Sequence, residues 1–265
     1  EDRILSLATG TLPDVDPPEV VRAAAAAGFS HTGLWFDPEE WTSQTTRDVR
    51  AALDDTGISI FDFEVIWISP GKHDPNHERA IELAAEFGAE NVLVVSSDPN
   101  PTETKNRFER ICALCGQVGI TAALEFLPIT EVRTLQDALD ILRDVDHPAG
   151  RLLVDPLHLA RSGGHPVDLK GVPEALFSYA QYCDAPMKLD DMSYGSLMKE
   201  AIDGRLLAGD GDLPLQELIA ALPEELPLAL ELRSKALRDA YPDPIARARR
   251  VLENAKAHLS AAEDL

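Results

Sequence analysis

The stretch Thr121–Asp155, TAALEFLPITEVRTLQDALDILRDVDHPAGRLLVD, contains two short apolar runs with an amphipathic run between them. The runs TAALEFL and RLLVD predict β-strands, and LQDALDILRDV predicts a helix. Thr134 followed by Asp137 is a variant of the capping box that begins helices. A strand–helix–strand order with continuous apolar strands is typical of parallel sheets that are covered on both faces.

The same alternation extends along the chain in both directions. Eight strands with intervening helices predict one (β/α)8 barrel, as a single domain over residues 1–265, with a doubly wound open sheet as the alternative. The predicted strands are Ile4–Ala8, Thr32–Phe36, Ser59–Val65, Asn91–Ser96, Thr121–Leu127, Arg151–Asp155, Ser178–Cys183 and Leu228–Leu232. The predicted helices are Pro17–Ala27 (capped by Asp16), Thr45–Thr56, Asn76–Phe87, Thr102–Val118, Leu135–Val145 and Pro244–His258.

Four predicted strands carry an oxygen-bearing side chain at or near the C-terminal end: Glu125, Asp155, Gln181 and Glu231. The C-terminal strand ends form the active-site face of a (β/α)8 barrel. Three carboxylates and one amide make a hard ligand set that suits Mg²⁺ or Mn²⁺. An ion pair, such as Glu231 with Arg233, would explain any one of these residues alone. Four of them on four strands favour a metal site.

Composition narrows the class of protein. The net charge of −22, from 46 acidic and 24 basic residues, disfavours nucleic acid as a partner because the phosphate backbone is repelled. No apolar run approaches the roughly 20 residues of a membrane span, and no signal peptide is recognised. The three cysteines, Cys112, Cys115 and Cys183, indicate a reducing compartment, so we expect a cytoplasmic protein. The Cys112–Cys115 pair lies within a helical pattern and is expected to pack in the core.

Five motifs carry a resemblance to a known family. They are ALEFLP (123–128), DPLHLARSGG (155–164), QYCDAP (181–186), GRLLAGDGDLPL (204–215) and LALELRS (228–234). With them, nearly the whole chain resembles the xylose-isomerase-like barrels. That family includes sugar phosphate isomerases and epimerases, inosose dehydratases, ketose 3-epimerases and bacterial metal-dependent 3-dehydroshikimate dehydratases. Ala208 and Asp210 depart from the Pro-Gly-Glu-Gly turn of many relatives, and the extra His ligands and basic loops of the endonuclease branch are lacking.

The resemblance implies roles for individual residues. Glu125, Asp155, Gln181 and Glu231 would bind a divalent metal, Mn²⁺ first, with Mg²⁺ or Co²⁺ as alternatives. Many relatives carry His at the position of Gln181, and the Gln form is similar to the dehydratase branch. Glu125, Glu231 and His158 are the expected catalytic residues, since two such carboxylates flank the reacting carbon in ketose epimerases. His158 either carries a proton or orients a ligand by hydrogen bonding.

The chemistry shared by these relatives is removal of a proton next to a carbonyl whose oxygen a metal polarises. We therefore predict an isomerase or epimerase of a small polyhydroxy ketone, with a dehydratase second and a non-catalytic binding or partner subunit third. Self-association is left open. Glu64 either lines the pocket or pairs with an arginine, and His31 either faces the substrate or sits in the barrel. The predicted substrate-contacting residues are His31, Trp35, Glu64, Trp67, Arg205 and Arg233.

Overall fold

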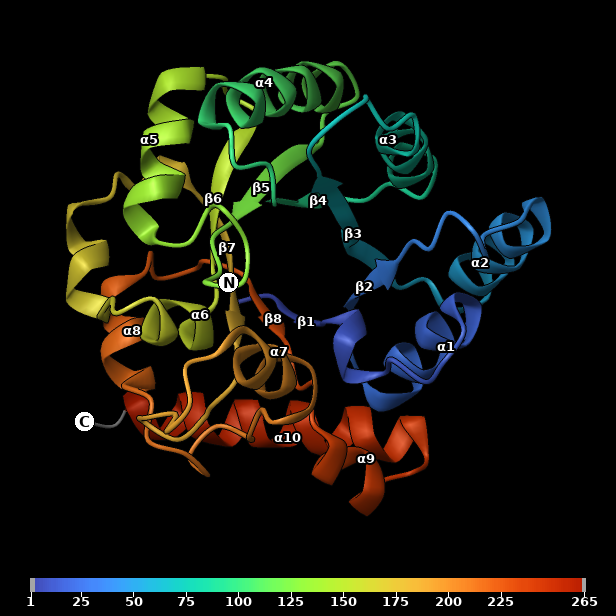
Figure 1. Cartoon of the computed structure of the whole chain (residues 1–265). Coiled ribbons are helices and arrows are strands. Elements are labelled where there is room, and N and C mark those ends of the chain that lie inside the picture. Colours follow the sequence, from blue (N-terminus) through green and yellow to red (C-terminus); the bar gives the residue numbers. More distant parts are fainter. Residues whose placement is uncertain (1–2, 264–265) are drawn as a thin grey trace.

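The structure, a computed structural model, describes residues 3–263 and contains one closed barrel of parallel strands in the order β1 to β8 (Figure 1). The strands are β1 (Leu5–Leu7), β2 (His31–Trp35), β3 (Ser59–Ile68), β4 (Asn91–Ser96), β5 (Thr121–Glu125), β6 (Gly150–Val154), β7 (Phe177–Tyr182) and β8 (Leu228–Leu230). Strand β1 closes the barrel by pairing with β8, with Leu7 opposite Leu230. The predicted (β/α)8 barrel is confirmed, and the open sheet is excluded.

Helices surround the barrel (Figure 1). They are α1 (Pro17–Ala27), α2 (Ser43–Thr56), α3 (Asn76–Glu86), α4 (Pro101–Gln117), α5 (Leu135–Val145), α6 (Pro156–Arg161), α7 (Tyr194–Asp203), α8 (Leu215–Ala221), α9 (Lys235–Ala240) and α10 (Pro244–Glu263). The capping box of Thr134 and Asp137 is confirmed, whereas the Asp16 side chain makes no capping hydrogen bond. Among the described residues, none of the helices combines the length and apolarity needed to cross a membrane.

The apolar core has two layers. The larger layer lies between strands and helices and includes Val92 and Val94 of β4. It also buries Cys112 and Cys115, as expected, and burial raises the pKa of both thiols to about 12. The smaller layer alternates with it along the strands, because successive strand residues point to opposite faces, and fills the barrel interior. Its members are Ala8, Phe61, Leu93, Val95, Ala123, Leu127, Leu153, Tyr179 and Ala229.

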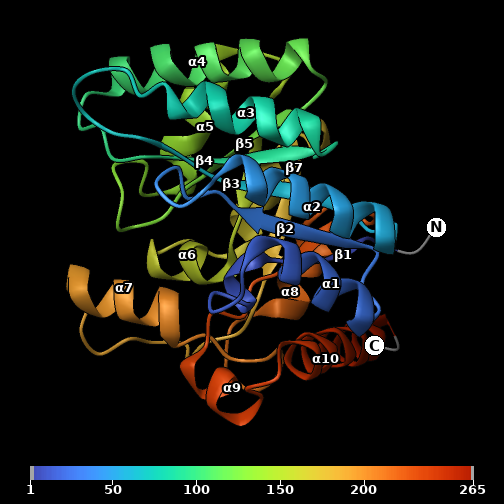
Figure 2. The ribbon, with the colours of Figure 1, turned by 90° about the vertical axis from the view of Figure 1, so that its right-hand side faces the viewer.

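The long connection between β7 and β8 borders the C-terminal end of the barrel. It contains α7, which lies at the same end of the barrel as α6 (Figure 2). Arg161 of α6 donates from Nε and Nη2 to the Glu200 carboxylate of α7, at 2.7 and 2.6 Å. Arg161 also donates to the carbonyls of Pro186 and Met187. Because both charged side chains are buried and paired, they fix α7 relative to α6.

A second buried carboxylate, Asp184, organises the turn that precedes α8. It accepts hydrogen bonds from the backbone N–H groups of Ala185, Gly209, Gly211 and Leu213, at 2.8 to 3.1 Å. A Cβ on Gly211 would lie 2.5 Å from Asp184 Oδ1, so only glycine permits this approach. The acceptor explains why the GDGD sequence folds into a tight turn beside β7.

Replacing Asp184 by Ala should lower the free energy of unfolding by about 3 kcal/mol, because four backbone donors lose a charged acceptor. Chemical denaturation followed by circular dichroism measures the change. Asp210→Ala is the matched control, since Asp210 lies exposed in the same turn, and it should change stability by less than about 0.5 kcal/mol. Equal stability of Asp184→Ala and the native chain would contradict the anchoring role.

Candidate metal centre and active-site pocket

The four predicted ligands meet at the C-terminal mouth of the barrel. Glu125 ends β5, Asp155 follows β6, Gln181 lies in β7 and Glu231 follows β8. Their exposed fractions are 6 %, 0 %, 3 % and 4 %, so each is buried. Parallel strands that close into a barrel bring their C-terminal ends to one face, which is why residues distant in sequence lie together.

Glu125, Asp155 and His158 form the centre of this cluster. One ligand atom from each lies within 4.8 Å of the others. His158 Nε2 is 3.8 Å from Glu125 Oε1 and 3.6 Å from Asp155 Oδ2. Asp155 is also the N-cap residue of α6, and its Oδ1 accepts a hydrogen bond from the Leu157 N–H at 2.8 Å. This cap fixes the carboxylate, and the first turn of α6 then brings His158 beside it.

The Gln181 amide faces two of the carboxylates. The amide atom that points toward them lies 3.1 Å from Glu125 Oε1 and 2.7 Å from Asp155 Oδ2. With no cation between the groups, this atom is the nitrogen, because NH₂ donates to both carboxylates. With a cation among them, half a turn of the amide presents the oxygen instead. Gln181 is therefore a fourth donor directed at the same cluster.

The cluster buries several carboxyl groups, and burial disfavours their ionised forms. Burial raises the pKa of Glu125 well above its usual range and also raises the pKa of Glu231. Burial opposes ionisation of Asp155 too, but Arg205 donates to Asp155 Oδ2 at 2.7 Å and its charge holds the pKa of Asp155 below the usual value. Arg205 also acts to lower the pKa of Glu125 and of Glu231, but burial outweighs this effect, so the pKa of both groups stays raised. A divalent cation would favour their ionised forms, and carboxylate and amide oxygens are donors that fit one.

A cavity of about 120 Å³ opens at these ligands. Trp35 and Trp67 form part of its rim, with exposed fractions of 43 % and 39 %. In the part of the chain that the structure describes, no ion pair joins Glu64 to an arginine, so the pairing alternative for Glu64 is not realised. The predicted substrate-contacting residues that line the cavity are Trp35, Glu64, Trp67, Arg205 and Arg233.

His31 does not join them, and its prediction as a substrate contact is corrected. It is the first residue of β2 and pairs with Ser6 and Ser59, at the N-terminal end of the barrel. Its ring lies 2.8 Å from Ser30 Oγ and 3.5 Å from Glu90 Oε1. A parallel barrel separates the two ends of each strand, so a residue that begins a strand cannot reach the pocket.

The sequence did not reveal the side of the cavity that α7 forms. Met198, Ala201 and Ile202 line the cavity from this helix. This helix was not among those predicted from the sequence. Arg205 follows α7 and donates from Nε to the Ala201 carbonyl, so the helix also positions this arginine. The missed signal is the pattern SLMKEAID, in which apolar residues recur at helical spacing.

Gly10, in the short helical turn η1 (Thr9–Thr11), leaves the space that the Glu231 carboxylate occupies. A Cβ on Gly10 would lie 2.0 Å from Glu231 Oε1 and 2.7 Å from Arg233 Cγ. The missing side chain therefore leaves the space that both residues occupy. Nothing in the local sequence LATGT distinguishes this glycine from a turn glycine, so sequence reasoning did not find it.

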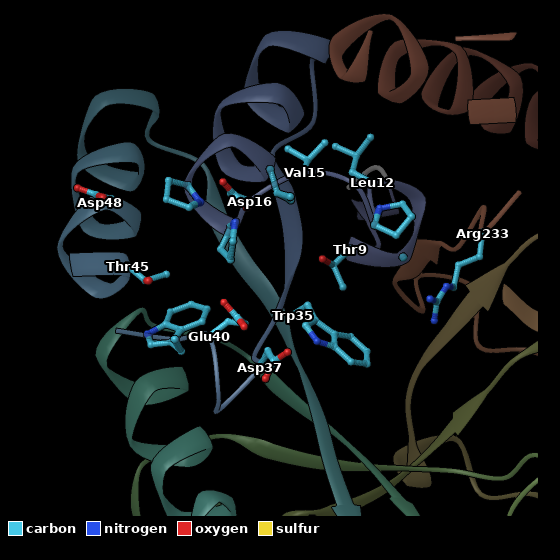
Figure 3. A pocket seen from close by; sticks show the side chains of 16 residues that line it. Thr9, Leu12, Val15, Asp16, Trp35, Asp37, Glu40, Thr45, Asp48 and Arg233 are labelled. Atoms are coloured by element: carbon cyan, nitrogen blue, oxygen red, sulfur yellow. The ribbon is translucent and has the colours of Figure 1, made fainter. Parts of the chain in front are cut away.

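A second, larger cavity has a volume of about 570 Å³. Figure 3 shows the side chains that line it. Its walls come from η1, the start of α1 and the connection between β2 and α2. Trp35 and Arg233 line both cavities, so these two side chains form the boundary between them. The larger cavity is lined by the carboxylates of Asp16, Asp37, Glu40 and Asp48.

Comparison with known proteins gives the family. A family model described as xylose isomerase-like TIM barrel matches residues 21–257. The chain belongs to the xylose isomerase-like TIM barrel family. The resemblance seen in the sequence motifs is thereby confirmed. Within this family, the chain is 26 % identical over 248 residues to a 3-dehydroshikimate dehydratase of Pseudomonas putida KT2440. That match covers 88 % of this chain but only 38 % of the relative, so the chain spans well under half of the relative's length.

Two solved structures of similar fold extend the comparison. An IolI protein with a bound zinc atom has a TM-score of 0.81 at 16 % identity, covering 98 % of this chain and 99 % of its own. A D-allulose 3-epimerase from Methylomonas sp. has a TM-score of 0.68 at 14 % identity, covering 97 % of this chain and 99 % of its own. At these identities the likeness concerns the barrel fold alone.

Adding Mn²⁺ to chelator-treated protein should raise the melting temperature, because the ion offsets buried charge that exists only in the folded state. At a metal concentration 1,000 times Kd, linkage gives about 4 kcal/mol of stabilisation. Thermal scans with Mn²⁺, Mg²⁺, Co²⁺ and Zn²⁺, together with elemental analysis of untreated protein, measure the effect. Asp155→Asn should lose most of the response, whereas Glu90→Gln, at the far end of the barrel, should keep it. A native chain that responds to none of the ions would contradict the metal site.

Gly10→Ala should weaken Mn²⁺ binding by tenfold or more, because the added Cβ displaces the Glu231 carboxylate. Calorimetric titration of Mn²⁺ measures the affinity, and circular dichroism checks that the barrel still folds. Gly195→Ala is the matched control, since a Cβ at Gly195 meets no atom within 4 Å. Unchanged affinity in Gly10→Ala would show that Glu231 does not bind the ion.

Proposed function

We propose that this chain is a divalent-metal-dependent lyase that eliminates water from a small cyclic polyhydroxy ketone of the 3-dehydroshikimate type. The observation that carries the proposal is the meeting of a buried oxygen donor set and an uncharged imidazole, His158, in one cavity. Removing a proton next to a carbonyl needs an electrophile for the carbonyl oxygen and a base within reach. Gln181 and the dehydratase name of the relative from Pseudomonas putida favour elimination, which reverses the order expected from the sequence.

The residues divide the chemistry among them. A divalent cation, for which Mn²⁺ is the first candidate, would be the Lewis acid that stabilises negative charge on the carbonyl oxygen. The residues that would hold it are Glu125, Asp155, Gln181 and Glu231. His158 is the base, because burial lowers its pKa to about 4 and its ring is therefore uncharged at neutral pH. Glu125 lies 3.8 Å from His158 Nε2 and stabilises the imidazolium that forms. Arg205 holds Asp155 in place through its hydrogen bond to Oδ2.

The cavity walls orient the substrate. Arg205 and Arg233 supply N–H donors that match substrate hydroxyl or carboxylate oxygens. Leu93, Val95 and the apolar residues of α7 exclude water from the opposite wall. A small, mostly apolar cavity with a few convergent polar groups is typical of small-molecule sites.

A ketose epimerase is the second candidate, and one observation favours it. Glu125 ends β5 and Glu231 follows β8, so β6 and β7 separate the two carboxylates around the mouth. Carboxylates on different sides of a substrate are what inversion at carbon requires, because one removes the proton and the other returns it from the opposite face.

A substrate panel in D₂O with Mn²⁺, followed by NMR and ultraviolet absorbance, tests the proposal. The panel contains 3-dehydroshikimate, a keto-inositol and several ketoses. A conjugated product that absorbs in the ultraviolet supports the lyase. A new diastereomer without such a product indicates the epimerase. A chain that neither transforms these compounds nor exchanges their protons with solvent is a binding protein, which would overturn the proposal.

Glu125→Gln and Glu231→Gln should each lower kcat by about 10²- to 10⁴-fold, because each loses a negative charge that would bind the metal, and Glu125→Gln also loses the charge that stabilises the imidazolium. Initial rates on the active panel compound measure the loss, and thermal scans check the fold. His158→Asn should cost as much if the imidazole is the base and much less if it only orients Glu125. Near-native activity of Glu231→Gln with bound Mn²⁺ would remove that residue from the mechanism.

A further inference from the structure

Two more carboxyl groups, those of Asp62 and Glu64, lie on β3 at the cavity. Asp62 is 0 % exposed, and Glu64 is 6 % exposed and lines the cavity. Tyr179 of β7 donates from its hydroxyl to Asp62 Oδ2 at 2.8 Å. Gly33 of β2 makes room for the pair, because a Cβ there would lie 2.3 Å from Asp62 Oδ1. The roles assigned to His158 and the four ligands use neither carboxyl group.

Each carboxyl group has one buried oxygen that no donor reaches in the described part of the chain, Asp62 Oδ1 and Glu64 Oε1. Two ionised carboxylates cannot hydrogen-bond to one another, because both only accept. A single proton on Glu64, donated to Asp62, satisfies the pair. Tyr179 and Glu64 then both donate to Asp62, and these hydrogen bonds oppose the rise that burial gives to the pKa of Asp62.

The surroundings place the proton on Glu64. Burial raises the pKa of Glu64 well above its usual range, and the negative charges of Asp62, Glu231 and Glu125 raise it further. The arginines of the cavity act elsewhere: Arg205 donates to Asp155, and the charge of Arg233 acts on Glu231. Glu64 is thus a neutral acid that faces the cavity, beside carboxylates that a metal would keep ionised.

We propose that Glu64 is the acid that protonates the hydroxyl leaving the substrate, and that Asp62 and Tyr179 hold the proton on Glu64. The inference rests on the lyase function proposed above. His158 takes a proton from the carbon next to the carbonyl, and the electron pair of that bond forms the new C=C bond. The C–O bond of the β-hydroxyl breaks with its electron pair, and the Glu64 proton joins the departing oxygen to give water. The proton on His158 returns through solvent to Glu64, so the enzyme regains its starting state.

Glu64→Gln separates the two halves of this reaction. Glutamine keeps the shape and can donate to Asp62, but it cannot transfer a proton. With Mn²⁺ and 3-dehydroshikimate in D₂O, the variant should retain exchange of the substrate's α-proton within about threefold of the native rate. Formation of the conjugated product should fall by 10²- to 10⁴-fold, the range for loss of a general acid. Asp62→Asn should lower product formation by a smaller factor. Glu64 remains in this variant, but it loses the carboxylate that accepts its hydrogen bond and keeps it protonated.

Two controls keep the outcome clear. The Mn²⁺-induced rise in melting temperature should be unchanged in Glu64→Gln, which shows that the fold and the metal site are intact. The Glu90→Gln variant removes a carboxylate at the N-terminal end of the barrel, far from the cavity, and should behave as the native chain does in every assay. Native product formation in Glu64→Gln overturns the inference and leaves the lyase proposal standing. An equal fall in exchange and product overturns it as well, because Glu64 would then act in the first step. A native chain that neither exchanges nor eliminates overturns both proposals.

Discussion

Burial of carboxyl groups at the barrel mouth is the constraint on which the rest of the site depends. Glu125, Asp155 and Glu231 lie within a low-dielectric interior, where an ionised group without a partner is costly. Different groups offset the cost of burying each carboxyl group. An arginine pairs with Asp155, the proton proposed for Glu64 would neutralise that group, and a divalent cation would offset the charge of Glu125 and Glu231. The chemistry proposed for the cavity is a consequence of how each carboxyl group is neutralised.

Asp155, a predicted metal ligand, is linked to helix α7 by a chain of contacts that returns to Asp155. Asp155 caps α6, α6 ends at Arg161, and Arg161 pairs with Glu200 of α7. Helix α7 is followed by Arg205, which returns to Asp155. Two segments about fifty residues apart in sequence, the start of α6 and Arg205, therefore both hold the Asp155 carboxylate. Displacement of α7 would therefore alter the hydrogen-bond partner of Asp155, although none of the predicted ligands lies in α7.

Much of the fold could be predicted because parallel strands that are covered on both faces are continuous apolar runs, and all eight occur close to the expected bounds. Glu125, Asp155 and Glu231 could be singled out because a buried carboxylate at the end of such a run is costly without a partner. That they bind a metal together with Gln181 stays a prediction. His31 was misplaced, although the predicted strand Thr32–Phe36 already put it at the N-terminal end of that strand, away from the pocket. Asp62 was missed because FDFEV resembles a strand with one polar face, whereas a register shift between β2 and β3 near Gly33 turns Asp62 inward. Close approaches such as Gly10 to Glu231 involve residues distant in sequence and leave no local pattern.

The boundary between the two cavities has a consequence for how the family can diversify. Trp35 and Arg233 line both cavities, and neither is among the predicted metal ligands. A smaller residue at either position would enlarge the space between the cavities of about 120 Å³ and about 570 Å³ without moving a strand. The reacting centre is tied to the rigid barrel, whereas the upper limit on ligand size is tied to two replaceable side chains. Substitution of Trp35 or Arg233 would therefore change the size of ligand that fits without altering the strands of the barrel.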